Sequence, residues 1–210
     1  HDIQNSILLT VMLINFFILG SSRLGACIKA VAFQGAILSL LPPLLHGISS
    51  HSLILSCIAF TLKGVAIPWL LFGAVKKVKI KRGIEPRIGY VPSLILGAIA
   101  TGGAFIFGDQ LPLISEHLHS LIIPTAMATL AMGFLLLITR MKAINQVLGY
   151  LVFENGIFLF GLLLLQAMPI MVETGVLLDM LVAIVVMGIV MNHINQEFSS
   201  LDTENLCLLR

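Results

Sequence analysis

The stretch LIIPTAMATLAMGFLLLI, residues 121–138, is predominantly apolar and contains no charged side chain. An α-helix of about 20 such residues spans the roughly 30 Å hydrocarbon core of a lipid bilayer. Inside that core a helix satisfies its own backbone hydrogen bonds, which an isolated strand cannot do. The stretch therefore predicts a transmembrane helix.

Further stretches of similar length and composition lie on both sides of it, at residues 3–20, 24–45, 53–75, 90–107, 143–166 and 174–192. Of the 210 residues, 58% are hydrophobic and only 10% are charged, and the mean hydropathy is +1.06. A soluble domain carries about 25% charged residues, because its surface must be hydrated. We therefore predict an all-α integral membrane protein with about seven transmembrane helices and no separate soluble domain.

The basic residues lie in alternate connections between these stretches. Arg23 follows the first stretch and Arg140 and Lys142 follow the fifth, whereas the third is followed by a basic run within residues 76–87. The connections after the second, fourth and sixth stretches hold no Lys or Arg. By the positive-inside rule, this pattern predicts an outside N-terminus and a cytoplasmic C-terminus. Such an alternation requires an odd number of helices, in agreement with seven.

The cysteines and histidines give no support for a bound metal or haem. Such sites need side chains brought together in sets, and neither residue type shows the required spacing along the chain. His117 and His119, two residues apart beside Glu116, suit a metal only in an extended segment. We therefore expect no cofactor and no metal.

Three charged residues lie deep within apolar stretches. Counted inward at ~1.5 Å per residue, Glu154, Lys63 and Asp179 lie roughly 18, 20 and 24 Å from the cytoplasmic ends of their helices. A bare charge at such a depth costs at least ~2.5–3.5 kcal/mol, so these side chains should face the helix bundle, another subunit or water. Desolvation favours a neutral carboxyl group and a nearby ammonium favours the charged one, so the set can exchange protons. We interpret all three as proton-path residues; a structural ion pair between Lys63 and one of the two acids is the alternative.

Other polar residues are weaker candidates for the same path. Asn155 directly follows Glu154, Glu173 lies in the loop before the last predicted helix, and His193 lies at the inner end of that helix. His193 is a candidate for proton entry, although a cation at a helix C-terminus is favourable in any case. Pro68 is expected to kink the third helix beside the buried lysine.

Residues 144–210 resemble the K subunit of respiratory complex I and the C subunit of Mrp-type cation/proton antiporters. The matching residues are Gly149, Glu154, Asn155, Asp179 and the tail LDTENL, residues 201–206. The spacing from Gly149 to Glu154 is wider than in those families, and the second acid is Asp instead of Glu. The resemblance divides the chain into a five-helix part, residues 1–142, and a K-subunit-like part, residues 143–210, which could also include the helix at 121–139.

The chain as a whole resembles component E of the hydrogenase-4 type. The matching stretches are residues 56–68, which contain Lys63, residues 146–156, and the region from Gly175 to the tail. This resemblance implies a multi-pass subunit of the bacterial or archaeal cytoplasmic membrane, in a complex of the group 4 hydrogenase or formate-hydrogenlyase type. Such a subunit has no catalytic centre and no cofactor of its own, although the complex is an oxidoreductase.

The resemblance also implies partners and residue roles. The partners would be antiporter-like and quinone-site-like membrane subunits, a soluble hydrogenase-type arm and membrane lipids, with no nucleic acid. By analogy with complex I, Glu154 and Asp179 would belong to a transmembrane proton path, whereas the role of Lys63 rests on its depth alone. A subunit of an Mrp-type antiporter and a purely structural scaffold are the alternatives.

Overall fold

The computed structural model describes residues 2–47, 49–77, 88–110, 121–140 and 143–164, and within these ranges it contains helices and no β-strand. Five segments are long and apolar enough to cross a membrane: Asp2–Gly20, Leu24–Leu45, Ser52–Gly73, Tyr90–Gly108 and Ile122–Thr139. They correspond to the first five predicted spans, so the described part is all-helical, as predicted, with five candidate membrane-spanning helices. The predicted span at residues 174–192 lies outside the described residues, so the count of seven stays a prediction.

The helices follow the predicted stretches closely. They are α1 (Asp2–Gly20), α2 (Leu24–Leu38), α3 (Leu41–His46), α4 (Ser50–Ala59), the π-helix η1 (Phe60–Ala66), α5 (Ile67–Lys77), α6 (Tyr90–Gln110), α7 (Ile122–Thr139) and α8 (Ala143–Leu164). The second predicted span is divided into α2 and α3, because prolines open α3 and cannot donate backbone hydrogen bonds to the preceding turn. The third is continuous through α4, η1 and α5.

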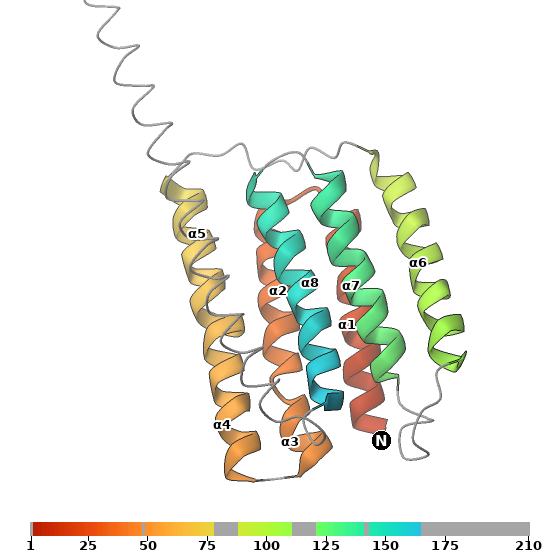
Figure 1. Cartoon of the computed structure of the whole chain (residues 1–210). Coiled ribbons are helices and arrows are strands. Elements are labelled where there is room, and N and C mark those ends of the chain that lie inside the picture. Colours follow the sequence, from red (N-terminus) through yellow and green to blue (C-terminus); the bar gives the residue numbers. More distant parts are fainter. Residues whose placement is uncertain (1, 48, 78–87, 111–120, 141–142, 165–210) are drawn as a thin grey trace, which may run out of the picture.

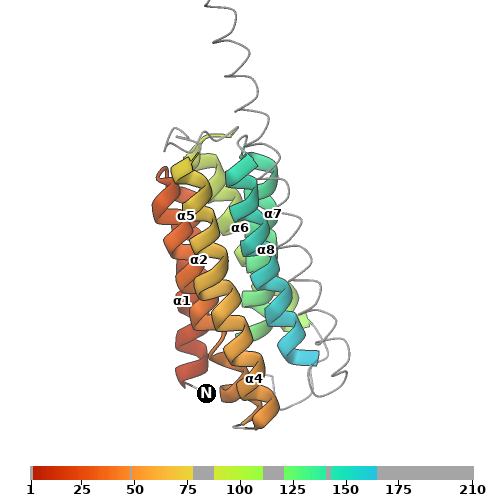
Figure 2. The same ribbon diagram turned by 90° about the vertical axis from the view of Figure 1, so that its left-hand side faces the viewer.

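The long helices lie side by side with their axes roughly parallel (Figures 1 and 2). The continuous α4–η1–α5 helix lies at one side of the bundle and α6 at the other, with α1, α2, α7 and α8 between them (Figure 1). The ends of α5 and α7 and the starts of α6 and α8 are at the same end of the bundle. The helices thus alternate in direction, as the alternating basic connections require. Which end faces the cytoplasm stays a prediction.

Glycines bring α7 and α8 into close contact. A Cβ atom on Gly149 would lie 2.8 Å from the backbone nitrogen of Leu137, and one on Gly156 would lie 2.8 Å from that of Leu130. In the same antiparallel register, Gly133 of α7 packs against the backbone of Phe153. Small residues allow membrane helices to approach in this way, since lipid provides no hydrophobic force between them. The glycines therefore fix how α8 is rotated against α7.

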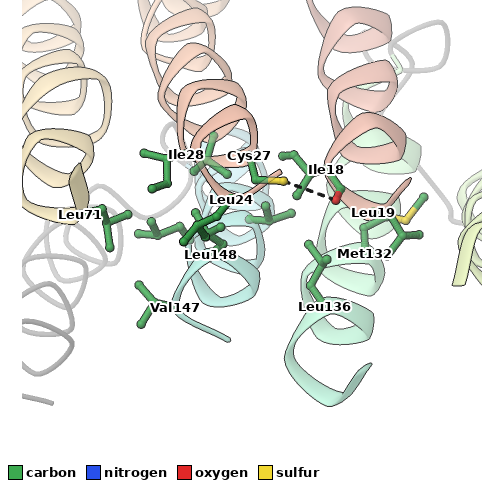
Figure 3. Packing of buried hydrophobic residues seen from close by; sticks show 13 residues of the cluster. Ile18, Leu19, Leu24, Cys27, Ile28, Leu71, Met132, Leu136, Val147 and Leu148 are labelled. Atoms are coloured by element: carbon green, nitrogen blue, oxygen red, sulfur yellow. Dashed lines mark hydrogen bonds between the residues drawn. The ribbon is translucent and has the colours of Figure 1, made fainter. Parts of the chain in front are cut away.

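Two clusters of buried hydrophobic side chains fill the bundle interior. The first, drawn in Figure 3, consists of Ile18, Leu19, Leu24, Cys27, Ile28, Val31, Leu71, Met132, Leu136, Val147, Leu148, Leu151 and Val152. The second consists of Leu8, Val11, Leu38, Leu41, Ile122, Ala126, Leu159 and Leu162. Both clusters take members from α1, α2, α7 and α8, so these four helices form the core of the described part.

Arg140, which directly follows α7, joins four helices at the end of the bundle where α1 ends. Its guanidinium donates a hydrogen bond to the carbonyl of Leu19, in the last turn of α1, and lies 5.3 Å from the centre of the Tyr90 ring on α6. Its own carbonyl accepts a hydrogen bond from Gln146 of α8 at 3.2 Å. Burial lowers the pKa of Arg140, opposed by the nearby Tyr90 and Cys27, but an arginine stays charged at physiological pH. The sequence indicated only that this residue helps to orient the chain.

Candidate functional site

Lys63 and Glu154 form an ion pair in the interior of the bundle. The Nζ atom of Lys63 lies 3.2 Å from Oε1 of Glu154, and the two side chains are only 9% and 2% exposed. The lysine comes from η1 and the glutamate from the middle of α8. Two of the three charges expected at depth are thus brought together.

The backbone around Lys63 is a π-helix instead of an α-helix. It covers Phe60–Ala66, and the amide of Ile67 donates to the carbonyl of Leu62, five residues earlier. Pro68 follows at once, and because it has no N–H it cannot continue the regular ladder of hydrogen bonds. The sequence predicted a disturbance beside the lysine, and the structure shows it as a widened turn.

An aromatic ring also lies beside the lysine. Nζ of Lys63 lies 4.8 Å from the centre of the Phe158 ring, which is one turn further along α8 than Glu154. The negative face of an aromatic ring attracts an ammonium group, most strongly where water is excluded. One helix, α8, therefore supplies both a carboxylate and a ring to the same cation.

A chain of hydrogen bonds between side chains begins beside the ion pair, at Asn155, and crosses the bundle. Asn155, next to Glu154, donates to Oε1 of Gln34 at 3.3 Å. Gln34 donates to Oδ1 of Asn15 at 2.8 Å, and Asn15 donates to Oγ1 of Thr129 at 2.8 Å. All four side chains are buried. The chain links α8, α2, α1 and α7 in that order.

These residues form a layer between the two hydrophobic clusters. On α1, Asn15 lies between Val11 of the second cluster and Ile18 of the first. The other three core helices show the same arrangement, with a polar residue between members of the two clusters. We refer to the set as the polar layer; it consists of Lys63, Glu154, Asn155, Gln34, Asn15 and Thr129.

The predicted site residues are placed only in part. Lys63, Glu154 and Asn155 lie in the polar layer. Asp179, Glu173 and His193 lie outside the described residues, and so do His117 and His119. Within the described ranges no three His, Cys, Asp or Glu side chains come together as a metal site would require.

Asn15, Gln34 and Thr129 are the members of the layer that sequence reasoning missed. Each is an uncharged polar residue inside an apolar stretch, for example Gln34 in the run AVAFQGAIL. Buried charges are the more conspicuous signal, since an isolated amide or hydroxyl is common in membrane helices. A search for every residue that needs a hydrogen-bond partner in lipid would have found them.

Comparisons with known proteins show a distant relationship. No protein-family model and no solved structure matches the chain. It is 29% identical to the Uncharacterized protein Rv0085 of Mycobacterium tuberculosis, over 95% of this chain and 92% of that protein. It is 27% identical to Hydrogenase-4 component E of Escherichia coli K12, over 75% of this chain and 73% of that protein, with the same values for the Shigella flexneri protein. The chain is thus distantly similar to a hydrogenase component along most of its length.

Proposed function

We propose that this chain is a non-catalytic membrane subunit of a hydrogenase complex and that Lys63 and Glu154 belong to its transmembrane proton path. The observation that carries the proposal is the buried ion pair, beside which a chain of hydrogen bonds crosses four helices. The distant similarity to hydrogenase-4 component E supports the kind of complex, of the group 4 or formate-hydrogenlyase type. The soluble partners would carry the redox chemistry.

The ion pair is neutral while both groups are charged, and uptake of a proton by Glu154 leaves one net positive charge on Lys63. While Glu154 is ionised, the ammonium of Lys63 balances it at 3.2 Å. A proton arriving on the carboxylate removes that attraction, and the remaining positive charge of Lys63 is then stabilised in part by the ring of Phe158. When the proton leaves Glu154 the pair forms again. In this proposal Asp179 is the second acid of the path, and Glu173 and His193 lie toward its two ends.

The first prediction concerns the carboxylate. Glu154→Gln keeps the shape of the side chain but cannot take up a proton, so hydrogenase-driven proton transport into vesicles should fall at least tenfold. Assembly of the complex, and hydrogenase activity with a soluble electron acceptor, should be retained. Asp2→Asn is the matched control, because Asp2 is an exposed acid at the start of α1. Wild-type transport by Glu154→Gln would contradict the proposal.

A structural role is the second candidate, and the short Lys63–Glu154 contact between η1 and α8 is the observation that favours it. Loss of assembly in both Glu154→Gln and Lys63→Met would support that role. Purification of a tagged chain distinguishes a hydrogenase subunit from a subunit of an antiporter. Nickel and iron–sulfur subunits should accompany it from a hydrogenase complex, whereas antiporter subunits alone would indicate a complex of Mrp type.

A further inference from the structure

The helix α2 contacts Lys63 and the sequence neighbour of Glu154 through two consecutive residues. Gln34 accepts a hydrogen bond from Asn155, the neighbour of Glu154 in α8. Gly35 faces the backbone of Lys63 in η1. Thus α2 lies against η1 at Lys63 and against α8 beside Glu154.

Gly35 determines how near Lys63 can come. A Cβ atom at this position would lie 2.7 Å from Cβ of Lys63 and 3.3 Å from the lysine carbonyl group. Cβ atoms do not approach one another so closely, so any larger residue must push η1 away from α2. One residue further along, a Cβ on Gly64 would be in ordinary contact with Ala36 at 3.4 Å. The close approach is therefore centred on the lysine.

Gln34 is held by hydrogen bonds to α1 and α8. Its amide nitrogen donates to Asn15 of α1, which in turn donates to Thr129 of α7, and its oxygen accepts from Asn155. The side chain is fully buried, with 0% exposure. Both ends of its amide form hydrogen bonds. The position of Gln34 is therefore fixed by α1 and α7, and Gln34 in turn holds α8 through Asn155.

We propose that Gln34 and Gly35 are positioning residues that set the separation of Lys63 and Glu154. This inference rests on the proposed function, in which that pair exchanges a proton. The geometry makes α2 a spacer, with η1 held at Gly35 and α8 held at Gln34. Among the described residues, few charged or titratable groups lie on the helices around Glu154. Lys63 faces it from η1, and α7 has no charged side chain. On α2, Lys29 is exposed and Cys27 packs near Ile18.

The test compares Gly35→Ala with Gly25→Ala in the complete membrane complex. Gly25 lies on the same helix, and a Cβ there meets nothing within 4 Å. Protonation of Glu154 is followed by the infrared carbonyl band of the neutral carboxyl group, identified by its loss in Glu154→Gln. We expect Gly35→Ala to move the protonation midpoint to higher pH, since the carboxylate loses part of the attraction of Lys63. Gly25→Ala should leave it in place, and equal midpoints in the two variants would overturn the proposal.

A second variant tests the positioning role if Gly35→Ala fails to assemble. Gln34→Met keeps the length of the side chain but cannot accept from Asn155 or donate to Asn15. It should move the same midpoint upward, whereas Gln110→Met, at an exposed glutamine in the last turn of α6, should not. A wild-type midpoint in Gln34→Met would also overturn the proposal.

Proton transport separates this inference from the function on which it rests. Displacing reacting groups by about 1 Å can slow a reaction up to about 100-fold, so transport by Gly35→Ala should fall about 10- to 100-fold. A moved midpoint with wild-type transport would sustain the positioning role and contradict the proposed function. An unmoved midpoint, with transport still lost in Glu154→Gln, would contradict the positioning role alone.

Discussion

At the scale of single residues, the buried charges are stabilised as a pair and not one by one. Taking an ion out of water costs several kcal/mol, and a nearby opposite charge returns that energy only with good geometry. Lys63 has such a partner in Glu154 and a further one in the ring of Phe158. The pair is neutral as a whole, which explains how two charges can lie between two hydrophobic clusters.

A double-variant cycle tests this account of the pair. Lys63→Met leaves Glu154 without its ammonium partner and should lower the free energy of unfolding in detergent by about 3–5 kcal/mol. Adding Glu154→Gln removes the remaining charge, so the double variant should be more stable than Lys63→Met. Lys29→Met, at an exposed lysine of α2, provides the control for loss of a positive charge. Equal thermal midpoints for Lys63→Met and Lys29→Met would show that the pair contributes nothing.

At the scale of elements, the rotation of α8 decides what faces the interior. Gly149 and Gly156 are seven residues apart, which is close to two helical turns, so they lie on nearly the same face of α8. That face packs against α7. Glu154 and Asn155 lie between them in sequence and point to η1 and α2 instead. The glycine contact and the polar contacts therefore specify the same orientation from two sides.

Alanine at Gly156 should disturb that orientation. Its Cβ would lie 2.8 Å from the backbone nitrogen of Leu130, which cannot give way as a flexible side chain would. Overpacking of this kind typically costs about 1–3 kcal/mol, measurable as a lower thermal midpoint of the purified protein. Gly161→Ala in the same helix is the matched control, since a Cβ there meets nothing within 4 Å. Equal midpoints would indicate that α7 and α8 are not held by this contact.

The sequence predicted the helices better than it predicted their contacts. Apolar length is a local property, so residues 121–138 sufficed to predict α7 almost to the residue. The depth of Lys63 and Glu154 was also readable, and a pair of Lys63 with either acid was the alternative interpretation. The contact of Lys63 with Glu154 depends on how η1 and α8 pack, which no local pattern encodes. The π-helix was not predicted as such, because Pro68 indicates only that a regular ladder must break.

At the scale of the whole molecule, the bundle has two different ends. Arg140 ties α1, α6, α7 and α8 together at the end where α1 finishes. At the opposite end a short turn joins α3 to α4, with Gly47 at a positive φ of 75° and a capping box between Ser49 and Ser52. The basic connections belong to the first end, which we predict to be cytoplasmic.

Cysteine labelling tests the orientation. In a chain without its own cysteines, Ser22→Cys lies between α1 and α2, and Ser50→Cys lies at the start of α4; both positions are exposed and belong to opposite ends of the bundle. A maleimide that cannot cross membranes should label Ser50→Cys in intact cells, and Ser22→Cys only after the cells are opened. The reverse pattern would show that the predicted orientation is wrong.

The polar layer also has a consequence for how the chain is made. Asn15 and Gln34 belong to adjacent helices, so their hydrogen bond can form as soon as the first two helices have left the ribosome. Lys63 is synthesised long before Glu154, its partner in the finished protein. During that interval its ammonium must be hydrated, or held by lipid phosphate or by the insertion machinery. Insertion of the third helix therefore takes place before the carboxylate that balances Lys63 has been made.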